Sequence, residues 1–262
     1  MSRDGSERLD EGWKREGWAR TYLTGIRGGI PLLAEQMDVM ARLVSAACGG
    51  PASVLDLGCG DGALAAALVE GRPGARATLV DFSPPMLGLA RARFSGHPSK
   101  VDFVAADFGD PGWVGLVEGF SSFDAVVSGY AIHHQTDERK MALYREIYGL
   151  LRPGGIFINM EHVASPTAWV GRVAEGHFDS ALGAFQERAG SPEGFPAEEL
   201  AERRGREAHV LAPVEDQCRW LRDIGFTDVD CFFKVFELAL FGGRRPGGPA
   251  GGAGGAGGKS GG

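Results

Sequence analysis

The sequence is poor in cysteine, has no excess of basic residues and contains no long apolar run. The cysteines are far apart and include no CxxC pair; they are Cys48, Cys59, Cys218 and Cys231. This spacing excludes a disulfide framework and a cysteine-based zinc motif, so we expect reduced thiols in a cytoplasmic protein. Lys and Arg number 27 against 34 Asp and Glu, which gives a net charge of −7. Such a chain lacks the electrostatic footprint of a general nucleic-acid binder.

The shortness of the apolar runs also argues against export and membrane insertion. Residues 1–20 are charged and lack the apolar stretch of a signal peptide. Elsewhere no apolar run approaches the roughly 20 residues of a membrane-spanning helix. We therefore expect no membrane partner. The sequence does not indicate whether the protein is a monomer or an oligomer.

Glycine is the residue in excess, with 42 among 262 residues. Twelve of the last 21 residues are glycine, so we expect residues 244–262 to form a disordered tail. The rest is not a disordered chain, because 44% of all residues are hydrophobic, enough to build a core. We expect an N-terminal helical cap over residues 1–45 and a main domain over 46–243. Residues 161–213 form an insertion in that domain.

The main domain alternates short apolar strands with helices. The predicted strands are Ser53–Leu57, Ala77–Asp81, Val101–Ala105, Phe123–Val127 and Ile156–Met160. The predicted helices between them are Ala63–Glu70, Ser83–Phe94 and Asp137–Leu151, with Ser83 as the N-cap of the second. Pro153–Gly155 is expected to stop the third helix. This alternation indicates an α/β fold, a parallel sheet with helices on both faces.

The alternation of short strands and helices stops after Met160. The insertion contains a helical stretch with large apolar residues on one side: Trp169, Val173, Phe178, Leu182 and Phe185. It is either a substrate wall or lid at the carboxyl edge of the sheet, or an extra helical layer. A helix is expected over Val214–Ile224, ended by Gly225. Two adjoining strands, Thr227–Val235 and Phe236–Phe241, are expected as an antiparallel pair at the sheet edge.

A glycine loop follows the first strand, in the sequence VLDLGCGDGA of residues 54–63. Glycines let backbone amides approach a ligand, and the following helix offers its positive end to an anion. Asp81 ends the next strand, where a carboxylate can hold ribose hydroxyls. These features fit a dinucleotide as well as another nucleoside ligand. Asp56 favours the latter, because a carboxylate repels a pyrophosphate and attracts an ammonium group.

These segments together resemble the class I S-adenosylmethionine-dependent methyltransferases. The residues that carry the resemblance are VLDLGCGDG (54–62), Asp81, AADF (105–108), GYAIHH (129–134) and LRPGG (151–155). The resemblance runs from about residue 54 to residue 158. It implies a Rossmann-like, mostly parallel seven-stranded sheet of strand order 3-2-1-4-5-7-6. It also implies S-adenosyl-L-methionine as the cofactor.

The resemblance further implies roles for single residues. Gly58, Gly60 and Gly62 would wrap the methionine part of the cofactor, and Asp56 would lie near its amino group. Asp81 would bind the ribose, and the adenine would contact Phe82, Met86, Asp107 and Phe108. Core packing is the alternative for Phe82 and Met86, and a helix N-cap for Asp107. Resembling proteins fold an N-terminal segment over the cofactor, where this chain has Tyr22, Arg27 and the helical pattern of residues 30–44.

Methyl transfer requires alignment and, for a hydroxyl or amine nucleophile, a base. Candidates at the ends of the fourth and fifth strands are Tyr130, His133, His134, Glu161 and His162. A histidine is the natural base near neutral pH, although His134 equally fits the cofactor pocket. We expect no metal, since the side chains of neighbouring residues point apart and no further ligand has suitable spacing.

The segments outside the core are similar to the carboxy-S-adenosylmethionine synthase branch. They are residues 30–44, the long insertion and residues 212–243. That branch uses S-adenosylmethionine as a substrate, takes a carboxyl group from prephenate and holds the anion with an arginine of the insertion. Arg203 or Arg204 falls near that place, and a solvated charge run is the alternative.

The sequence therefore predicts S-adenosylmethionine-dependent methyl transfer to a small-molecule acceptor, with no nucleic acid as partner. The alternatives are carboxy-S-adenosylmethionine synthesis and a nucleoside-binding module without catalysis. Hydride transfer with NAD is disfavoured by Asp56.

Overall fold

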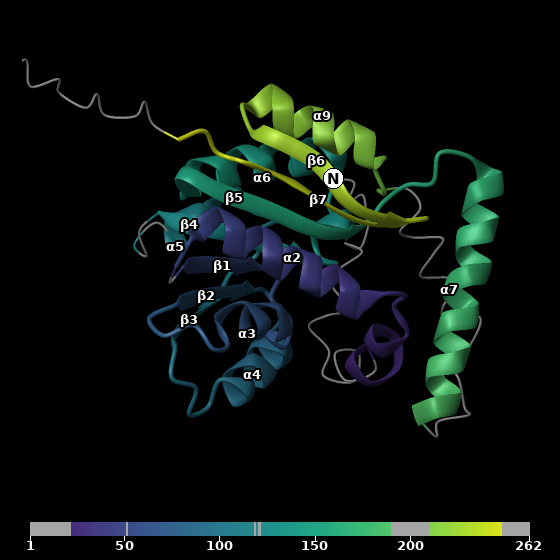
Figure 1. Ribbon diagram of the computed structural model, residues 1–262, viewed down its shortest axis with the longest axis horizontal. Coiled ribbons are helices and arrows are strands. Elements are labelled where there is room, and N and C mark those ends of the chain that lie inside the picture. The colour runs from purple at the N-terminus through teal and green to yellow at the C-terminus, as the bar shows by residue number, and fades with distance from the viewer. Residues whose placement is uncertain (1–21, 51, 118, 120–121, 190–209, 248–262) are drawn as a thin grey trace, which may run out of the picture.

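A seven-stranded sheet forms the centre of the molecule, with strand order β3-β2-β1-β4-β5-β7-β6 (Figure 1). The computed structural model describes residues 22–50, 52–117, 119, 122–189 and 210–247. The strands are β1 (Ser53–Leu57), β2 (Arg76–Asp81), β3 (Lys100–Ala105), β4 (Phe123–Gly129), β5 (Leu151–His162), β6 (Thr227–Val235) and β7 (Leu238–Arg244). The predicted fold class and strand order are confirmed.

The first five strands are parallel, and β7 lies antiparallel between β5 and β6. Val54 pairs with Ala77 of β2 and with Ala125 of β4, which places β1 at the centre of the parallel part. Parallel strands end at the same edge of a sheet, so the residues that follow β1, β2 and β4 meet there.

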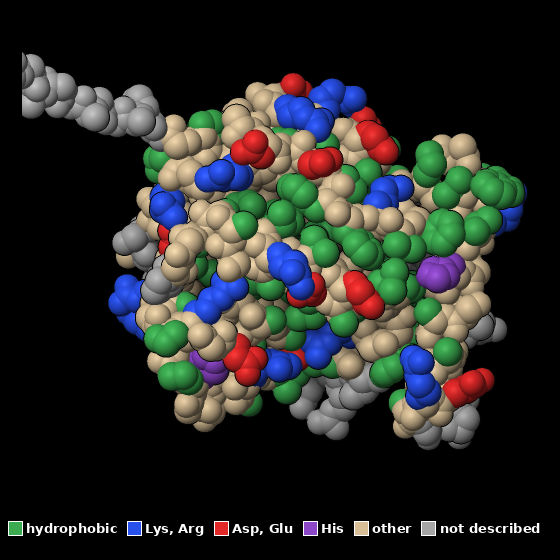
Figure 2. All heavy atoms as spheres, in the orientation of Figure 1, with side chains coloured by type: hydrophobic (Ala, Val, Ile, Leu, Met, Phe, Trp, Pro, Cys, Tyr) green, Lys and Arg blue, Asp and Glu red, His purple; other side chains and the backbone are tan. Residues whose placement is uncertain are grey.

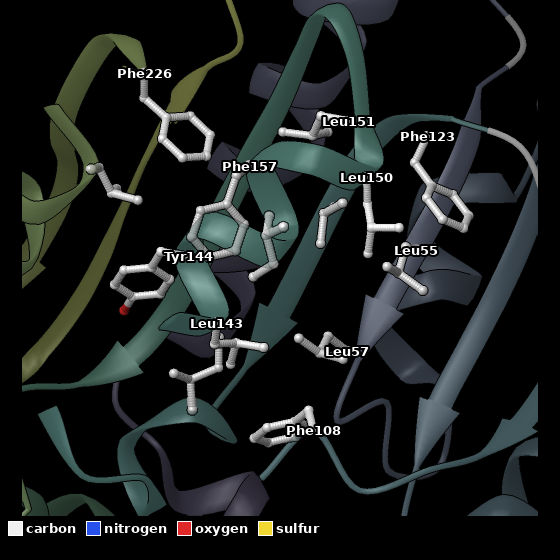
Figure 3. Close-up of a cluster of buried hydrophobic side chains, with 14 of the residues drawn as sticks. Leu55, Leu57, Phe108, Phe123, Leu143, Tyr144, Leu150, Leu151, Phe157 and Phe226 are labelled. Carbon is white, nitrogen blue, oxygen red and sulfur yellow. The ribbon is translucent and has the colours of Figure 1, made fainter. Parts of the chain in front are cut away.

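Helices cover both faces of the sheet. On one face lie α2 (Leu33–Cys48), α3 (Ala63–Val69) and α4 (Pro84–Arg93), which pack on the sheet through residues such as Met40 and Leu68. On the other face lie α5 (Val114–Val117), α6 (Asp137–Leu150) and α9 (Val214–Ile224). Figure 3 shows the core of this second face, where Tyr144, Phe157 and Phe226 lie together. Burial of these apolar surfaces against the sheet is the main force that holds the layers together.

Local signals set the ends of several helices as expected. The Ser83 hydroxyl accepts from the Met86 amide at 3.3 Å and caps α4, whose first residue is Pro84. Gly225, with φ of 115°, ends α9 in the left-handed region. Thr136 caps α6 in the same way as Ser83 caps α4.

Two predicted boundaries are wrong. The α6 helix ends at Leu150, and Leu151 already begins β5, where Pro153–Gly155 form an irregular stretch before regular pairing resumes at Ile156. Phe236 lies in the turn between β6 and β7 with φ of 52°, and β7 continues to Arg244. Strand β5 thus includes Pro153–Gly155, which were expected to end a helix, and β7 includes Arg244, which was expected to begin the tail. Residues 248–262 lie outside the described residues.

The insertion begins with α7 (Ala168–Ala189), which stands at the side of the sheet (Figure 1). Its inner face carries Ala174, Phe178, Leu182 and Phe185, at helical spacing of three and four residues. Trp169 and Val173 were predicted on that side, but they are 67% and 39% exposed. Each of them lies one position before the inner face, which corresponds to a rotation of about 100°. Figure 2 shows hydrophobic side chains gathered over the end of α7 that carries them.

The N-terminal segment packs against α7 on one side and leads into α2. It consists of η2 (Tyr22–Ile26) and η3 (Arg27–Gly29), followed by α2. A Cβ atom at Gly28 would overlap the Phe185 ring, and one at Gly29 would lie 2.7 Å from Leu182 Cδ1. The two glycines therefore allow close packing against α7. The predicted division after residue 45 falls inside α2, whose Met40 and Val44 pack on the sheet.

Candidate functional site

A cavity of about 270 Å³ opens at the carboxyl ends of β1, β2 and β4. Several residues predicted for the cofactor line it: Asp56, Gly58, Gly60, Asp81, Phe82, Met86 and Phe108. Tyr22, Leu23 and Arg27 of the N-terminal segment line it too. The N-terminal segment thus forms one wall of the cavity.

The glycine loop takes its shape from left-handed backbone conformations. Gly58, Gly60 and Gly62 have φ of 70°, 54° and 76°. The amide of Gly58 donates to the Val80 carbonyl at 2.8 Å, which ties the loop to β2. A Cβ atom at Gly58 would overlap that of Ala131. Glycine is required there, because both the backbone angle and the close approach exclude a side chain.

Two buried carboxylates face this cavity from β1 and β2. Asp56 is 1% exposed; its Oδ2 accepts from the Ala65 amide at 3.0 Å, while Oδ1 has no hydrogen-bond partner among the described residues. Burial raises the pKa of Asp56 to about 7. Asp81 accepts from the Ser83 and Gly60 amides, at 2.8 Å each, and burial raises the pKa of Asp81 to about 6.

Two predicted cofactor residues do not line the cavity. Gly62 is the N-cap of α3, and a Cβ there would lie 3.0 Å from Leu79 and Phe94 side-chain atoms. Asp107 accepts from the Gly109 amide at 2.8 Å, so its side chain shapes the loop that brings Phe108 to the cavity. In both cases the local fold accounts for the residue type.

Asp61 of the glycine loop forms ion pairs that the sequence did not suggest. Its Oδ1 accepts from Arg27 Nη1 at 2.5 Å, and its Oδ2 pairs with Arg93 of α4. Burial alone would raise the pKa of Asp61, but the two guanidinium groups outweigh burial and lower it. The carboxylate thus fastens the N-terminal segment to the loop and to α4. Two arginines far away in sequence gave no signal of this contact.

A second cavity, of about 170 Å³, lies beside the first. Tyr22 and Tyr130 line both, so they form the boundary between the two. Tyr130 has φ of 53°, an unusual angle for a residue other than glycine, and its hydroxyl donates to Gln36 Oε1 at 2.9 Å. Burial raises the pKa of Tyr130 well above its ordinary value, so the phenol stays protonated. This favours a structural donor and not a base.

His133 and Glu161 form a buried pair at the wall of the second cavity. His133 Nδ1 lies 2.6 Å from Glu161 Oε1, and the His133 amide donates to Glu161 Oε2 at 3.0 Å. In the neutral form of the ring, a carboxylate beside Nδ1 selects the tautomer with its proton on Nδ1, which leaves Nε2 as an acceptor. Nε2 has no hydrogen-bond partner among the described residues. The His133 ring is 3% exposed and lines the second cavity.

The other predicted catalytic and substrate residues are placed as follows. His134 lines the first cavity, and its ring centroid lies 3.9 Å from that of His133. Glu161 lies behind His133 and lines neither cavity. Arg203 and Arg204 lie outside the described residues. Within residues 22–50, 52–117, 119, 122–189 and 210–247, no group of three or more His, Cys, Asp or Glu side chains is arranged to hold a metal ion.

Comparison with known proteins shows the family to which the chain belongs. Residues 54–155 match the family described as methyltransferase domain. The chain is 32% identical over 160 residues to demethylmenaquinone methyltransferase of Thermus thermophilus, covering 57% of this chain and 70% of that relative. It is 32% identical over 223 residues to carboxy-S-adenosyl-L-methionine synthase of Aeromonas hydrophila, covering 82% of each.

The chain belongs to the class I S-adenosylmethionine-dependent methyltransferases. Solved methyltransferases share the fold. An O-methyltransferase family protein from Burkholderia thailandensis has a TM-score of 0.59 at 17% identity, covering 90% of this chain and 62% of that one. The chain thus spans about three fifths of the length of that protein. A 1,6-didemethyltoxoflavin-N1-methyltransferase of the same organism has a TM-score of 0.52 at 19% identity, covering 87% of each chain.

The residues of the first cavity fit S-adenosylmethionine, the methyltransferase cofactor. The buried Asp56 Oδ1 lacks a partner among the described residues and suits an ammonium group. The Asp81 carboxylate accepts from three backbone amides and retains acceptor capacity for a hydroxyl. Phe82, Met86 and Phe108 supply apolar surface for the adenine ring.

All four cysteines are free thiols. No helix among the described residues has the length and apolarity that a membrane span requires.

Proposed function

We propose that this methyltransferase acts on a small-molecule acceptor bound in the second cavity, with His133 as the general base. The observation that carries the proposal is the juxtaposition of two cavities. Tyr22 and Tyr130 line both, and His133 lines the acceptor side with Nε2 available. A cavity of about 170 Å³ suits a small molecule and not a macromolecular segment.

The first cavity holds the cofactor in this proposal. Asp56 binds the amino group, the backbone at Gly58 and Gly60 surrounds the methionine part, and Asp81 binds the ribose. Phe82, Met86 and Phe108 pack on the adenine, and His134 lines the same cavity. The bound cofactor supplies an electrophilic methyl group.

His133 prepares the acceptor for that methyl group. Glu161 orients the ring through Nδ1, and Nε2 accepts the proton of an acceptor hydroxyl or amine as its oxygen or nitrogen becomes the nucleophile. Glu161 also stabilises the imidazolium that results, since the two groups are 2.6 Å apart and buried. Its remaining hydrogen bonds, from the amides of His133 and His162 and from Asn159 Nδ2, keep the carboxylate in place.

The N-terminal segment completes the site by covering it. Tyr22 separates the two cavities, and the Arg27–Asp61 contact holds its segment over the first. Exclusion of water strengthens the polar contacts made inside and protects the alignment on which displacement depends.

Carboxy-S-adenosylmethionine synthesis is the second candidate. One observation favours it: the Aeromonas relative with that activity is covered over 82% of its length. In this case the acceptor site would hold prephenate, with Arg203 or Arg204 as its anion partner. Mass spectrometry of the cofactor after incubation with prephenate tests this directly, since a carboxylated cofactor would support it. A nucleoside-binding module is the third candidate, and cofactor binding without turnover would support that.

The decisive experiment uses S-adenosylmethionine with a labelled methyl group and a whole cell extract, whose small-molecule and macromolecular fractions are then counted separately. We expect the label to appear in a small product. His133→Gln should lower the rate by about 100- to 10,000-fold, the range for a lost general base. Cofactor affinity should stay unchanged. His97→Gln, in the loop between α4 and β3 and outside both cavity linings, is the matched control and should retain full activity. Full activity in His133→Gln would remove the base from the proposal, and label in macromolecules alone would refute a small acceptor.

A further inference from the structure

The second cavity has an apolar body. Its walls come from the N-terminal segment, α7 and the turn between β6 and β7, and they include Ile26, Ile30, Pro31, Phe178, Val235 and Phe236. Aromatic and branched aliphatic side chains on several sides leave little opportunity for hydrogen bonds to the middle of a ligand. Such a lining binds a ring or another compact apolar framework.

The charged side chains of this cavity are carboxylates. Glu175 of α7 and Glu237 of the β6–β7 turn line it, and no Lys or Arg does so within the described part of the chain. The other polar side chains of the lining are three histidines and two tyrosines: His133, His162, His177, Tyr22 and Tyr130. The first cavity differs in this respect, since Arg27 lines it.

Glu237 is held in a defined position. Ser165 Oγ donates to its Oε1 at 2.6 Å, and His162 Nε2 lies 3.1 Å from its Oε2. The side chain of Glu237 is 21% exposed. A carboxylate oriented through both oxygens is a preorganised acceptor for a hydrogen-bond donor, and it repels an anion.

A second observation points to a ligand at the same place. His133 is buried in the wall of this cavity, and its Nε2 has no hydrogen-bond partner among the described residues. A buried polar nitrogen without a partner is rare in folded proteins, and a bound ligand is one way to satisfy it. The cavity therefore offers two acceptors, His133 Nε2 and Glu237. His162 lies between them, since its ring centroid is 5.9 Å from that of His133 and its Nε2 is 3.1 Å from Glu237 Oε2.

We infer that the acceptor is an uncharged or cationic ring compound that presents two hydrogen-bond donors, one to His133 and one to Glu237. One donor, a hydroxyl or amine on the ring, faces His133 and is the group methylated. The other, a hydroxyl or ammonium group, binds Glu237. This inference rests on the proposed function, and it excludes dianionic acceptors such as prephenate. Electrostatic repulsion by Glu175 and Glu237 supplies the selectivity against anions.

Binding of matched compounds tests the inference without any turnover. The panel consists of phenol, indole and naphthol frameworks, each carrying an ethyl alcohol, an ethylamine or a propionate side chain. Heats of binding are measured on the full chain in the presence of S-adenosylhomocysteine. We expect alcohols or amines of at least one framework to bind ten-fold or more tightly than the matching carboxylate. Tighter binding of carboxylates, or no binding of any alcohol or amine, would overturn the inference.

Two variants locate the selectivity. Glu237→Gln should weaken binding of the amine about ten-fold relative to the alcohol and narrow the gap to the carboxylate. Glu187→Gln, an exposed position later on α7, is the matched control and should leave all affinities unchanged. Equal selectivity in Glu237→Gln and the unmodified protein would contradict the role of Glu237. Failure of the proposed function is a different result: selectivity as expected, with methyl transfer that His133→Gln leaves intact.

Discussion

The two cavities of this protein are built in different ways. The first lies where β1, β2 and β4 end, and most of its wall comes from short segments directly after these strands. The second combines the N-terminal segment, the ends of β4 and β5, α7 and the β6–β7 turn, which are distant in sequence. The first therefore follows from the sheet itself, whereas the second depends on how added segments pack around it. This division fits the proposal that the first cavity holds a cofactor common to the family and the second a particular acceptor.

The largest expected effect is on cofactor binding in the first cavity. Gly58→Val should abolish measurable cofactor binding, because a side chain there overlaps Ala131 and the backbone is left-handed. The strain should also lower the free energy of unfolding by about 1–3 kcal/mol. Calorimetric titration with S-adenosylhomocysteine measures the first quantity and urea denaturation the second.

Gly88→Ala is the matched control for that substitution. Gly88 lies in α4, and a Cβ there meets nothing within 4 Å. This variant should bind the cofactor normally and gain about 0.5–1 kcal/mol of stability from the higher helix propensity of alanine. Normal binding by Gly58→Val would show that the first cavity is less rigid than its geometry implies.

Asp56→Asn should separate binding from stability. We expect cofactor affinity to fall by about 10- to 100-fold, the effect of losing a charged hydrogen bond of 1.5–3 kcal/mol. The stability of the ligand-free protein should rise at pH 8. The pKa of Asp56 is raised to about 7 in the folded state, so the neutral acid is favoured there and stability is lost as pH rises through 7.

The pH dependence checks this sign. The stabilising effect of Asp56→Asn should be largest above pH 7, and should disappear near pH 4, below which the carboxyl is neutral in both states. In the unmodified protein, cofactor affinity should decrease as pH falls below 7, since the ionised form binds the ammonium group. Melting curves and titrations at pH 5, 6.5 and 8 measure both. An equal loss of affinity and stability in Asp56→Asn would contradict this assignment.

The smallest expected effect concerns the contact between Arg27 of the N-terminal segment and Asp61 of the glycine loop. Arg27→Gln removes one partner of Asp61 while Arg93 keeps the other. We expect a three- to ten-fold loss of cofactor affinity, mostly through faster release. The change in stability should be about 1 kcal/mol, because the pair is only partly buried. Stopped-flow release of the cofactor product measures the rate, with Arg42→Gln on the exposed face of α2 as control. An unchanged release rate would mean that the segment does not restrain the cofactor.

The same contrast explains what could be predicted from the sequence. Strand–loop–helix alternation and the positions of Gly58, Asp56 and Asp81 follow local rules, so the parallel sheet and the first cavity could be anticipated. The order of the strands came from the resemblance to a known family. Gly62 and Asp107 lie in two different parts of the resemblance, but neither lines the cavity: Gly62 is the N-cap of α3, and Asp107 accepts from the Gly109 amide. Sequence spacing alone cannot separate these two uses of a residue.

The second cavity could be predicted only in part. His133 and Glu161 were candidates because both follow strands, but nothing in the sequence showed that Glu161 would orient His133 while His134 turned toward the first cavity. Glu237 and Arg27 depend on contacts with Ser165 and Asp61, more than 30 residues away. Trp169 was assigned to the inner face of α7 by approximate spacing, and one residue of offset moved it to the surface.

A crystal structure with bound S-adenosylhomocysteine tests the division between the two cavities most directly. We predict that its amino group lies within hydrogen-bond distance of Asp56 Oδ1, its ribose contacts Asp81 and its sulfur reaches the boundary at Tyr22 and Tyr130. The second cavity should remain free of this ligand. A ligand whose homocysteine part occupies the second cavity, or whose amino group is far from Asp56, would contradict the account.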